Sequence, residues 1–152
     1  MNDKLLLHDS ETLKHINDVR ENLWKLIKHL DDRAQKHDAS KMENPEREIF
    51  AENTPELAKT EYGSDEYQKL LEKVRPAIDH HYAKNRHHPE HFVNGIDDMD
   101  LLDIVEMISD WSAATKRNKN GNIHKSIEFN TDRFKMTPQL AKILKNTVDR
   151  YF

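Results

Sequence analysis

The stretch that decides the fold is residues 10–34, SETLKHINDVRENLWKLIKHLDDRA. Its apolar residues recur in steps of three and four, so they fall on one face of an α-helix. Ser10 precedes them as a candidate N-cap, with Glu11 in the first turn. The stretch therefore predicts an amphipathic helix, whose apolar face consists of Leu13, Ile16, Val19, Leu23, Ile27, Leu30 and Ala34.

Further helix signals follow along the rest of the chain. Asn44-Pro45 and Thr54-Pro55 each place a capping side chain before a proline, which predicts a short helix after each. Residues 84–99 are predicted to form a loop. With three glycines in the chain and no β-branched runs, the sequence argues against sheets. We expect an all-α fold of about six to seven helices in one domain over residues 1–152, in which three of the later helices are capped by Ser64, Asp100 and Thr137.

Composition excludes several classes of protein. The chain has no cysteine, so disulfides and thiolate metal sites are impossible. Its formal net charge of −4 argues against a nucleic-acid binder, and a solvated turn explains the basic residues at 116–125 better. No apolar run approaches the roughly 20 residues of a membrane span. The apolar stretch near the N-terminus is too short for a signal peptide, and an acidic residue precedes it. We therefore expect a cytoplasmic protein that does not enter a membrane.

Histidines concentrate in one short region, since five of the ten lie between residues 80 and 91. Imidazole is the commonest metal ligand in proteins, although a polar loop can also use histidine as an adaptable hydrogen-bonding group. His81 continues the apolar stripe of the preceding helix, whereas His80 points elsewhere. His88 is held extended because Pro89 follows it. His87 and His91 could touch substrate or solvent.

A second candidate pair is His37-Asp38. His37 lies three residues after Ala34 and therefore on the buried face of the first helix. The pair offers a nitrogen and an oxygen ligand at a helix end, or simply a core histidine beside a capping aspartate. A third candidate is Asp110, which shares one helix face with Asp103 and Glu106. Asp110 is favoured because the residues after it are expected to be buried, namely Trp111, Ala113 and Ala114.

These residues resemble a known family. His37-Asp38-Ala39-Ser40-Lys41 resembles the HD-x-G-K signature of the HD superfamily of metal-dependent phosphohydrolases, which are all-α bundles. Asp110 followed by Ala114 is similar to the family's late Asp, and His15 with Val19 to its first His. Residues 87–91, HHPEH, are similar to the His-His-Glu segment of the two-metal branch that cleaves cyclic dinucleotides, but the Gly-Tyr-Pro of that branch is missing. Nearly the whole chain resembles an uncharacterised, phage-associated family of small HD-like proteins.

The resemblance implies one or two divalent metal ions, and an all-nitrogen-and-oxygen ligand set is compatible with Mn, Fe, Co, Ni or Zn. In a straight helix His15 and His37 would lie about 33 Å apart. His15 can therefore join the site only if the chain folds back, and residues 30–33 are the polar place for such a turn. The expected metal ligands are His15, His37, Asp38, His81, His88 and Asp110.

The expected activity is hydrolysis of a nucleotide or nucleotide-like phosphoester by a metal-activated water. Lys41 would neutralise charge on the phosphoryl oxygens. The residues expected to act in catalysis are Asp38, Lys41 and His88, and those expected to bind substrate are Lys41, Asn85, His87 and Arg117. The alternative is a non-catalytic metal-binding interaction module, for example a phage-encoded inhibitor of a host protein.

Overall fold

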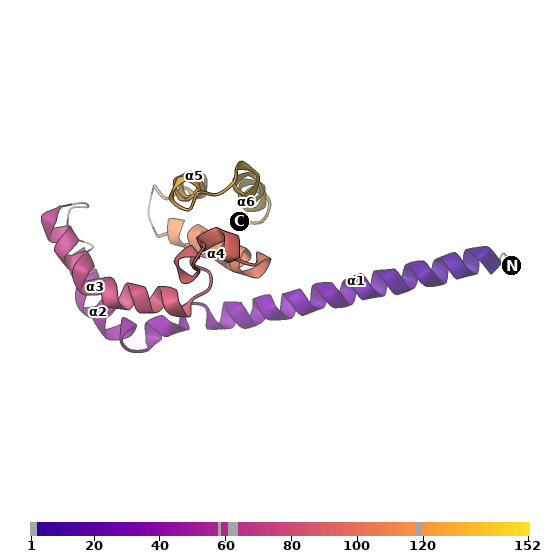
Figure 1. The fold of residues 1–152 in the computed structure, drawn as a ribbon, viewed down its shortest axis with the longest axis horizontal. Helices are drawn as coiled ribbons and strands as arrows, with labels where there is room; N and C mark the ends of the chain where they lie inside the picture. The colour runs from indigo at the N-terminus through magenta and orange to yellow at the C-terminus, as the bar shows by residue number, and fades with distance from the viewer. Residues whose placement is uncertain (1–2, 58, 61–63, 118–119) are drawn as a thin grey trace. The chain divides into compact units, whose positions relative to one another are not determined.

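The computed structural model describes residues 3–57, 59–60, 64–117 and 120–152 (Figure 1). All of its regular structure is helical, so the all-α prediction is confirmed. The chain divides into two compact units, Met1–Lys36 and His37–Phe152, and each is described by itself. The prediction of one domain stays a prediction.

The first unit is formed by one long helix, α1 (Asp3–Lys36). It begins seven residues before Ser10, so the predicted N-cap is wrong, because the apolar run Leu5-Leu6-Leu7 extends the helix towards the N-terminus. The helix also continues through residues 30–33, where the fold-back that His15 needs was expected. Without Gly or Pro, this polar segment has nothing that breaks a helix.

The second unit contains five α-helices and three 3₁₀ turns among its described residues. A capping side chain accepts a backbone hydrogen bond at Ser64, Asp100 and Thr137, as predicted. The two short helices expected after Pro45 and Pro55 are instead one helix, which contains Pro55 in its last turn. In chain order the elements are η1 (Ala39–Met42), α2 (Glu46–Leu57), α3 (Asp65–Lys84), η2 (Pro89–His91), η3 (Gly95–Asp98), α4 (Leu101–Thr115), α5 (Ile123–Arg133) and α6 (Pro138–Tyr151).

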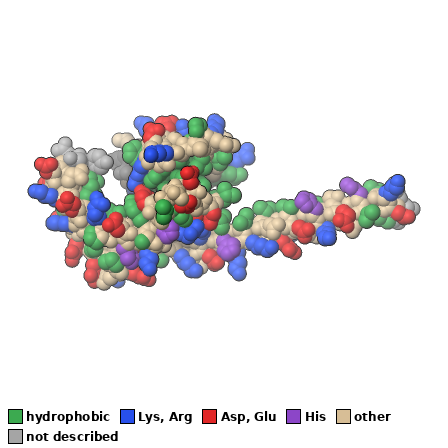
Figure 2. Space-filling view, in the orientation of Figure 1, with side chains coloured by type: hydrophobic (Ala, Val, Ile, Leu, Met, Phe, Trp, Pro, Cys, Tyr) green, Lys and Arg blue, Asp and Glu red, His purple; other side chains and the backbone are tan. Residues whose placement is uncertain are grey.

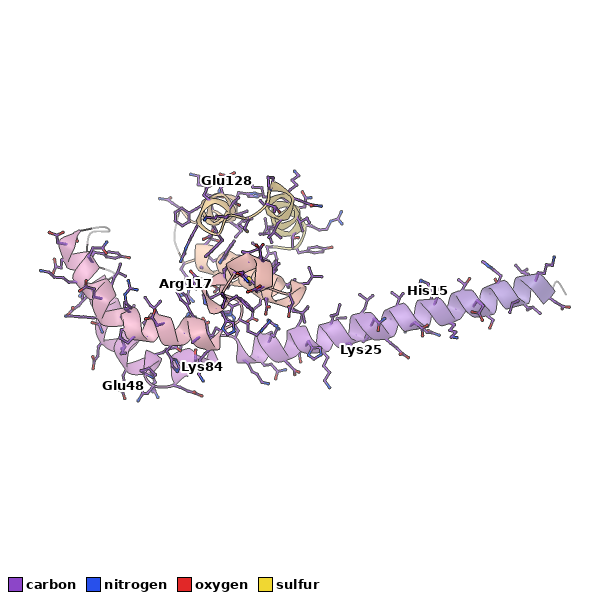
Figure 3. All side chains as sticks on the ribbon, viewed as in Figure 1. His15, Lys25, Glu48, Lys84, Arg117 and Glu128 are labelled. Carbon is purple, nitrogen blue, oxygen red and sulfur yellow. The ribbon has the colours of Figure 1, made fainter. Side chains whose placement is uncertain are left out.

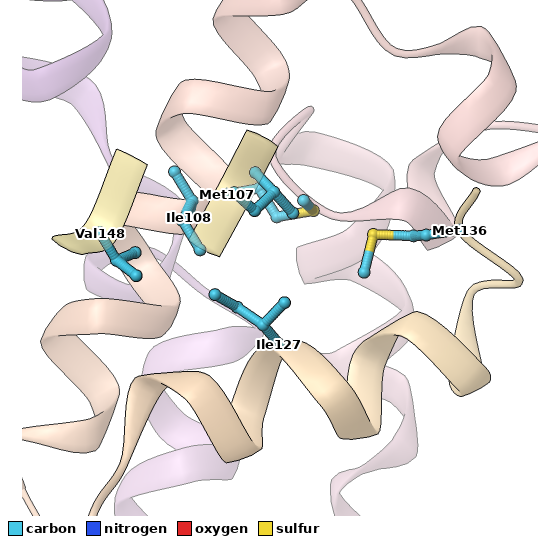
Figure 4. Close-up of a cluster of buried hydrophobic side chains, with 6 residues drawn as sticks. Met107, Ile108, Ile127, Met136 and Val148 are labelled. Carbon is cyan, nitrogen blue, oxygen red and sulfur yellow. The ribbon is translucent and has the colours of Figure 1, made fainter. Parts of the chain in front are cut away.

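Two packed layers hold the second unit together. The helices α2 and α3 lie side by side, and α3 buries one face through Leu70, Val74 and Ala77 (Figure 1). In the other layer, α4 packs against α5 and α6 around a hydrophobic core (Figure 4). Its buried members are Met107, Ile108, Ile127, Met136, Leu144 and Val148. Between the layers run η2 and η3, in the segment expected to be a loop.

No helix in the described part of the chain combines the length and apolar character that crossing a membrane requires.

Candidate metal centre

Seven side chains of the second unit, Asp38 among them, form one cluster. They come from the turn before η1, the C-terminal end of α3, the segment that follows it, and α4. The ligand atoms of four of them, one carboxylate oxygen and three imidazole nitrogens, all lie within 4.8 Å of one another. The seven are His37, Asp38, His81, His87, His88, Glu106 and Asp110.

Asp38 lies at the middle of this cluster because of its backbone and its neighbour Lys41. Its φ of 56° is left-handed, a conformation that aspartate tolerates better than most residues. Oδ2 accepts a hydrogen bond of 2.6 Å from the Lys41 ammonium, whereas Oδ1 is buried and has no hydrogen-bond partner. Burial alone would raise the pKa of Asp38, but Lys41 and the neighbouring histidines hold it below its ordinary value. The carboxyl group is therefore ionised.

His87 presents a second buried atom without a partner. Its Nδ1 lies 3.2 Å from Glu106 Oε1, and a carboxylate only accepts, so Nδ1 is the donor. Nε2 is buried, lies 3.5 Å from Asp38 Oδ1, and has no hydrogen-bond partner. Two buried polar atoms without hydrogen-bond partners lose solvation without compensation. A cation bound to both would satisfy both.

His81 faces the same oxygen from the last turn of α3. Its Nδ1 donates to Glu46 Oε2 at 2.9 Å, which leaves the Nε2 lone pair 3.4 Å from Asp38 Oδ1. Glu46 is fully buried and also accepts from His80 Nδ1 at 2.7 Å. Burial would raise the pKa of Glu46, but these histidine contacts and Ser40 lower it. A carboxylate behind an imidazole is the usual means of fixing the tautomer and orientation of a metal-binding histidine.

His88 completes this group. Its Nε2 lies 2.9 Å from His81 Nε2, and its backbone is extended before Pro89, as predicted. Burial, followed by the charges of His87 and His81, lowers the pKa of His88 to about 3, so the ring is neutral. We call Asp38 Oδ1 with these three imidazoles the histidine side of the centre. One carboxylate and three imidazoles form a donor set suited to Zn, Fe, Mn, Co or Ni.

The other oxygen of Asp38 belongs to a second group, which we call the carboxylate side. His37 donates from Nδ1 to Glu106 Oε1 at 2.9 Å, and its Nε2 lies 3.6 Å from both Asp38 Oδ2 and Asp110 Oδ1. Asp110 and then Glu106 raise the pKa of His37 to about 10. The field here is therefore strongly negative, and Asp38 could bridge two ions, one on each side.

Three predicted site residues lie elsewhere or act differently. In α1, His15 is 21 residues before Lys36, about 32 Å along the helix axis, so the structure does not bring it to His37 (Figure 3). Arg117 is exposed beyond the end of α4. The Asn85 amide donates to Ser40 Oγ and to the His81 carbonyl, both at 2.8 Å, and so caps α3 rather than facing a substrate.

His87 also differs from its expected role at a substrate rim, because only 2% of the residue is exposed. Ala113 and Ala114 were expected to be buried near Asp110, but both are exposed. Asp103, on the same helix face, has a structural role. It accepts two hydrogen bonds from the Arg86 guanidinium and completes the capping box of α4.

Sequence reasoning did not select Glu46 or Glu106. The spacing that placed Glu106 on one face with Asp110 could have found it, because α4 directs both carboxylates at His37. Nothing in the sequence marks Glu46, since an acid in the first turn of a helix is ordinary.

Fold and site together define an all-α protein with a candidate centre for a divalent metal ion. The chain belongs to a family of unknown function (DUF5662), whose profile matches residues 4–150. Comparisons with curated proteins and with solved structures gave no match.

Proposed function

We propose that the protein is a metal-dependent phosphohydrolase that acts on a nucleotide or nucleotide-like phosphoester, as its resemblance to the HD superfamily implies. The observation that carries the proposal is the pair of buried atoms without partners, Asp38 Oδ1 and His87 Nε2, which lie 3.5 Å apart. Such a pair is costly in a folded protein unless a cation binds there. Asp38, His81, His87 and His88 would hold the first ion, and His37 and Asp110 would join Asp38 around a second.

When bound, the ion would act as a Lewis acid and lower the pKa of a coordinated water towards neutrality. The residues of the chain supply the rest. Glu46 accepts from Nδ1 of His81 and Glu106 faces Nδ1 of His87, so that Nε2 of each of these two rings is directed at Asp38. Lys41 is exposed and its ammonium lies beside Asp38, where it would neutralise charge on a phosphoryl oxygen.

The test combines elemental analysis of the purified protein with hydrolysis of a panel of nucleotides and generic phosphoesters. We expect bound transition metal and metal-dependent release of phosphate or nucleotide, both lost in His87→Ala. The matched control is His124→Ala, because His124 is a partly exposed histidine on α5 that pairs with Asp149 away from the centre. Protein without stoichiometric metal after reconstitution would overturn the proposal.

Metal without turnover on the whole panel would instead support the non-catalytic interaction module. In that case the metal centre is structural, and the bound ion stabilises the fold without taking part in a reaction. A large loss of thermal stability on metal removal, with no hydrolysis before removal, is its expected signature.

A further inference from the structure

Apolar side chains line the whole length of α1 and are open to solvent (Figure 2). In the described part of its unit, α1 is the sole element, so nothing in that unit covers them. A helix with a continuous apolar stripe is stabilised by packing of that stripe, not by helix propensity. The stripe consists of Leu5, Leu6, Leu13, Ile16, Val19, Leu23, Leu26 and Ile27, each between 42% and 60% exposed.

The centre of this stripe has the repeat of a coiled coil. Ile16, Val19, Leu23, Leu26 and Leu30 follow one another in strictly alternating steps of three and four, which is the a and d pattern of a heptad. A strict repeat of 3.5 residues keeps a seam facing one partner helix. The pattern therefore points to a partner that is itself a long helix.

Length identifies which helix of this protein could be that partner. The stripe from Leu5 to Ile27 spans about 33 Å, and α1 with its 34 residues is about 51 Å long. The next longest helix, α3, has 20 residues and reaches about 30 Å. Within the described chain, only α1 of a second copy is long enough to cover the stripe from end to end.

The two edges of the seam decide the direction of pairing. One edge is mostly apolar, with Leu6, Leu13 and Ile27 interrupted by Arg20, and the other is polar. Parallel pairing would set the apolar edge of each helix against the polar edge of the other, whereas antiparallel pairing joins like edges. The polar edge consists of His8, His15, Asn22 and His29.

We propose that α1 pairs with α1 of a second copy of this chain in an antiparallel, two-stranded coiled coil. A register in phase with the a and d repeat, centred on residue 21, places Ile16 opposite Leu26 of the second copy, and Leu23 opposite Val19. The same register sets Asp9 opposite Arg33 at each end, so opposite charges meet there. Eight half-exposed residues offer roughly 700 Å² per copy, close to the about 800 Å² per partner of a stable interface.

The first experiment measures the mass of the full chain in solution by sedimentation over a range of concentrations. We expect twice the 18.0 kDa of one chain for the natural sequence. Leu23→Glu should weaken the dimer by about 100-fold or more, because it places a charge in the seam of both copies. Lys28→Glu, on the polar side of α1, is the control and should leave the dimer intact.

The second experiment tests direction and needs no change within the seam. Because the chain has no cysteine, a single Glu11→Cys accepts one spin label per copy. Antiparallel pairing separates the two labels by about 30 Å along the axis, whereas parallel pairing sets them at the same height. Labels at the same height would overturn the antiparallel arrangement.

A chain that stays monomeric at every concentration would overturn the proposal. So would a Leu23→Glu variant that lowers the thermal midpoint without changing the mass, because the stripe would then be covered within one chain. Neither readout depends on bound metal or hydrolysis, so the proposal stands or falls separately from the proposed function.

Discussion

The two sides of the metal centre share Asp38 but differ in what they offer a cation. On the histidine side, His81 and His87 are almost fully buried, with side chains 6% and 2% exposed, and Asp38 Oδ1 has no hydrogen-bond partner. On the carboxylate side, His37 and Asp110 are 30% and 29% exposed, and Asp38 Oδ2 already accepts from Lys41. The carboxylate side already holds two positive charges, those of His37 and Lys41.

This difference predicts an order of binding. The raised pKa of His37 means that this ring is protonated at neutral pH, and the Lys41 ammonium lies 2.6 Å from the shared carboxylate. An ion on the carboxylate side would have to displace the proton from His37 and would still be repelled by the Lys41 ammonium. On the histidine side the imidazoles are desolvated, and neutral His88 needs to lose no proton. We therefore expect the first ion on the histidine side and a weaker second ion on the carboxylate side.

Replacing the shared ligand should have the largest effect. Asp38→Ala removes the carboxylate that the histidine side and the carboxylate side share, so each side loses one oxygen ligand. We expect no stoichiometric metal after reconstitution and affinity lower by about 1000-fold or more, since changes in the outer shell alone cost 10–100-fold. Titration calorimetry measures this, with Asp79→Ala on the exposed face of α3 as control. Retention of one tightly bound ion by Asp38→Ala would show that the two sides are not built around this residue.

Removing one histidine from each side should separate them. His87→Ala should lower the affinity for the first ion by about 100-fold or more, whereas His37→Ala should leave it within a few fold and abolish binding of the second. Elemental analysis after dialysis against graded metal concentrations distinguishes the two. Equal losses in the two variants would contradict the order of binding.

The sequence predicted those parts of the fold and the site that follow from helical periodicity. His81 was expected on the buried face of its helix, and the structure places it there, because the buried stripe that runs through Val74 and Ala77 extends one more turn. The cap at Asp100 follows from local chemistry in the same way. His37 and Asp38 were selected from the stripe before them and from the resemblance of residues 37–41 to a known signature.

Periodicity stops where the helices stop, and most of the differences lie there. His87 follows the end of α3, so no pattern could tell that it points into the centre. Glu46 approaches His81 from 35 residues away in sequence, a contact that only the packing of α2 along α3 creates. His15 was placed near His37 by analogy, but a continuous α1 separates them.

Glu46 gives the next smaller effect, because it supports only the histidine side. In Glu46→Gln the shape is kept, but an amide is a weaker acceptor than a carboxylate for the Nδ1 protons of His80 and His81. Affinity for the first ion should fall by about 10–100-fold, with the second ion changed less. Nitrogen NMR of His81 should show its proton distributed between Nδ1 and Nε2. Glu48→Gln, exposed on the same helix, is the control. An unchanged first-ion affinity would mean that Glu46 serves packing alone.

Lys41 offers the smallest but most informative test, because its two proposed effects have opposite signs. Lys41→Met removes the ammonium that lies 2.6 Å from Asp38 Oδ2, which should strengthen binding of the second ion by about 10-fold, the value of one charge near a part-exposed site. The same change should slow hydrolysis, since no cation then neutralises the phosphoryl oxygens. Binding is measured by titration with the first site filled, and turnover is measured at saturating metal. Lys73→Met, exposed on α3, controls for loss of charge alone. If Lys41→Met weakened the second ion, Lys41 would be holding Asp38 in place rather than competing with the ion, and the contrast between the two sides would lose its electrostatic basis.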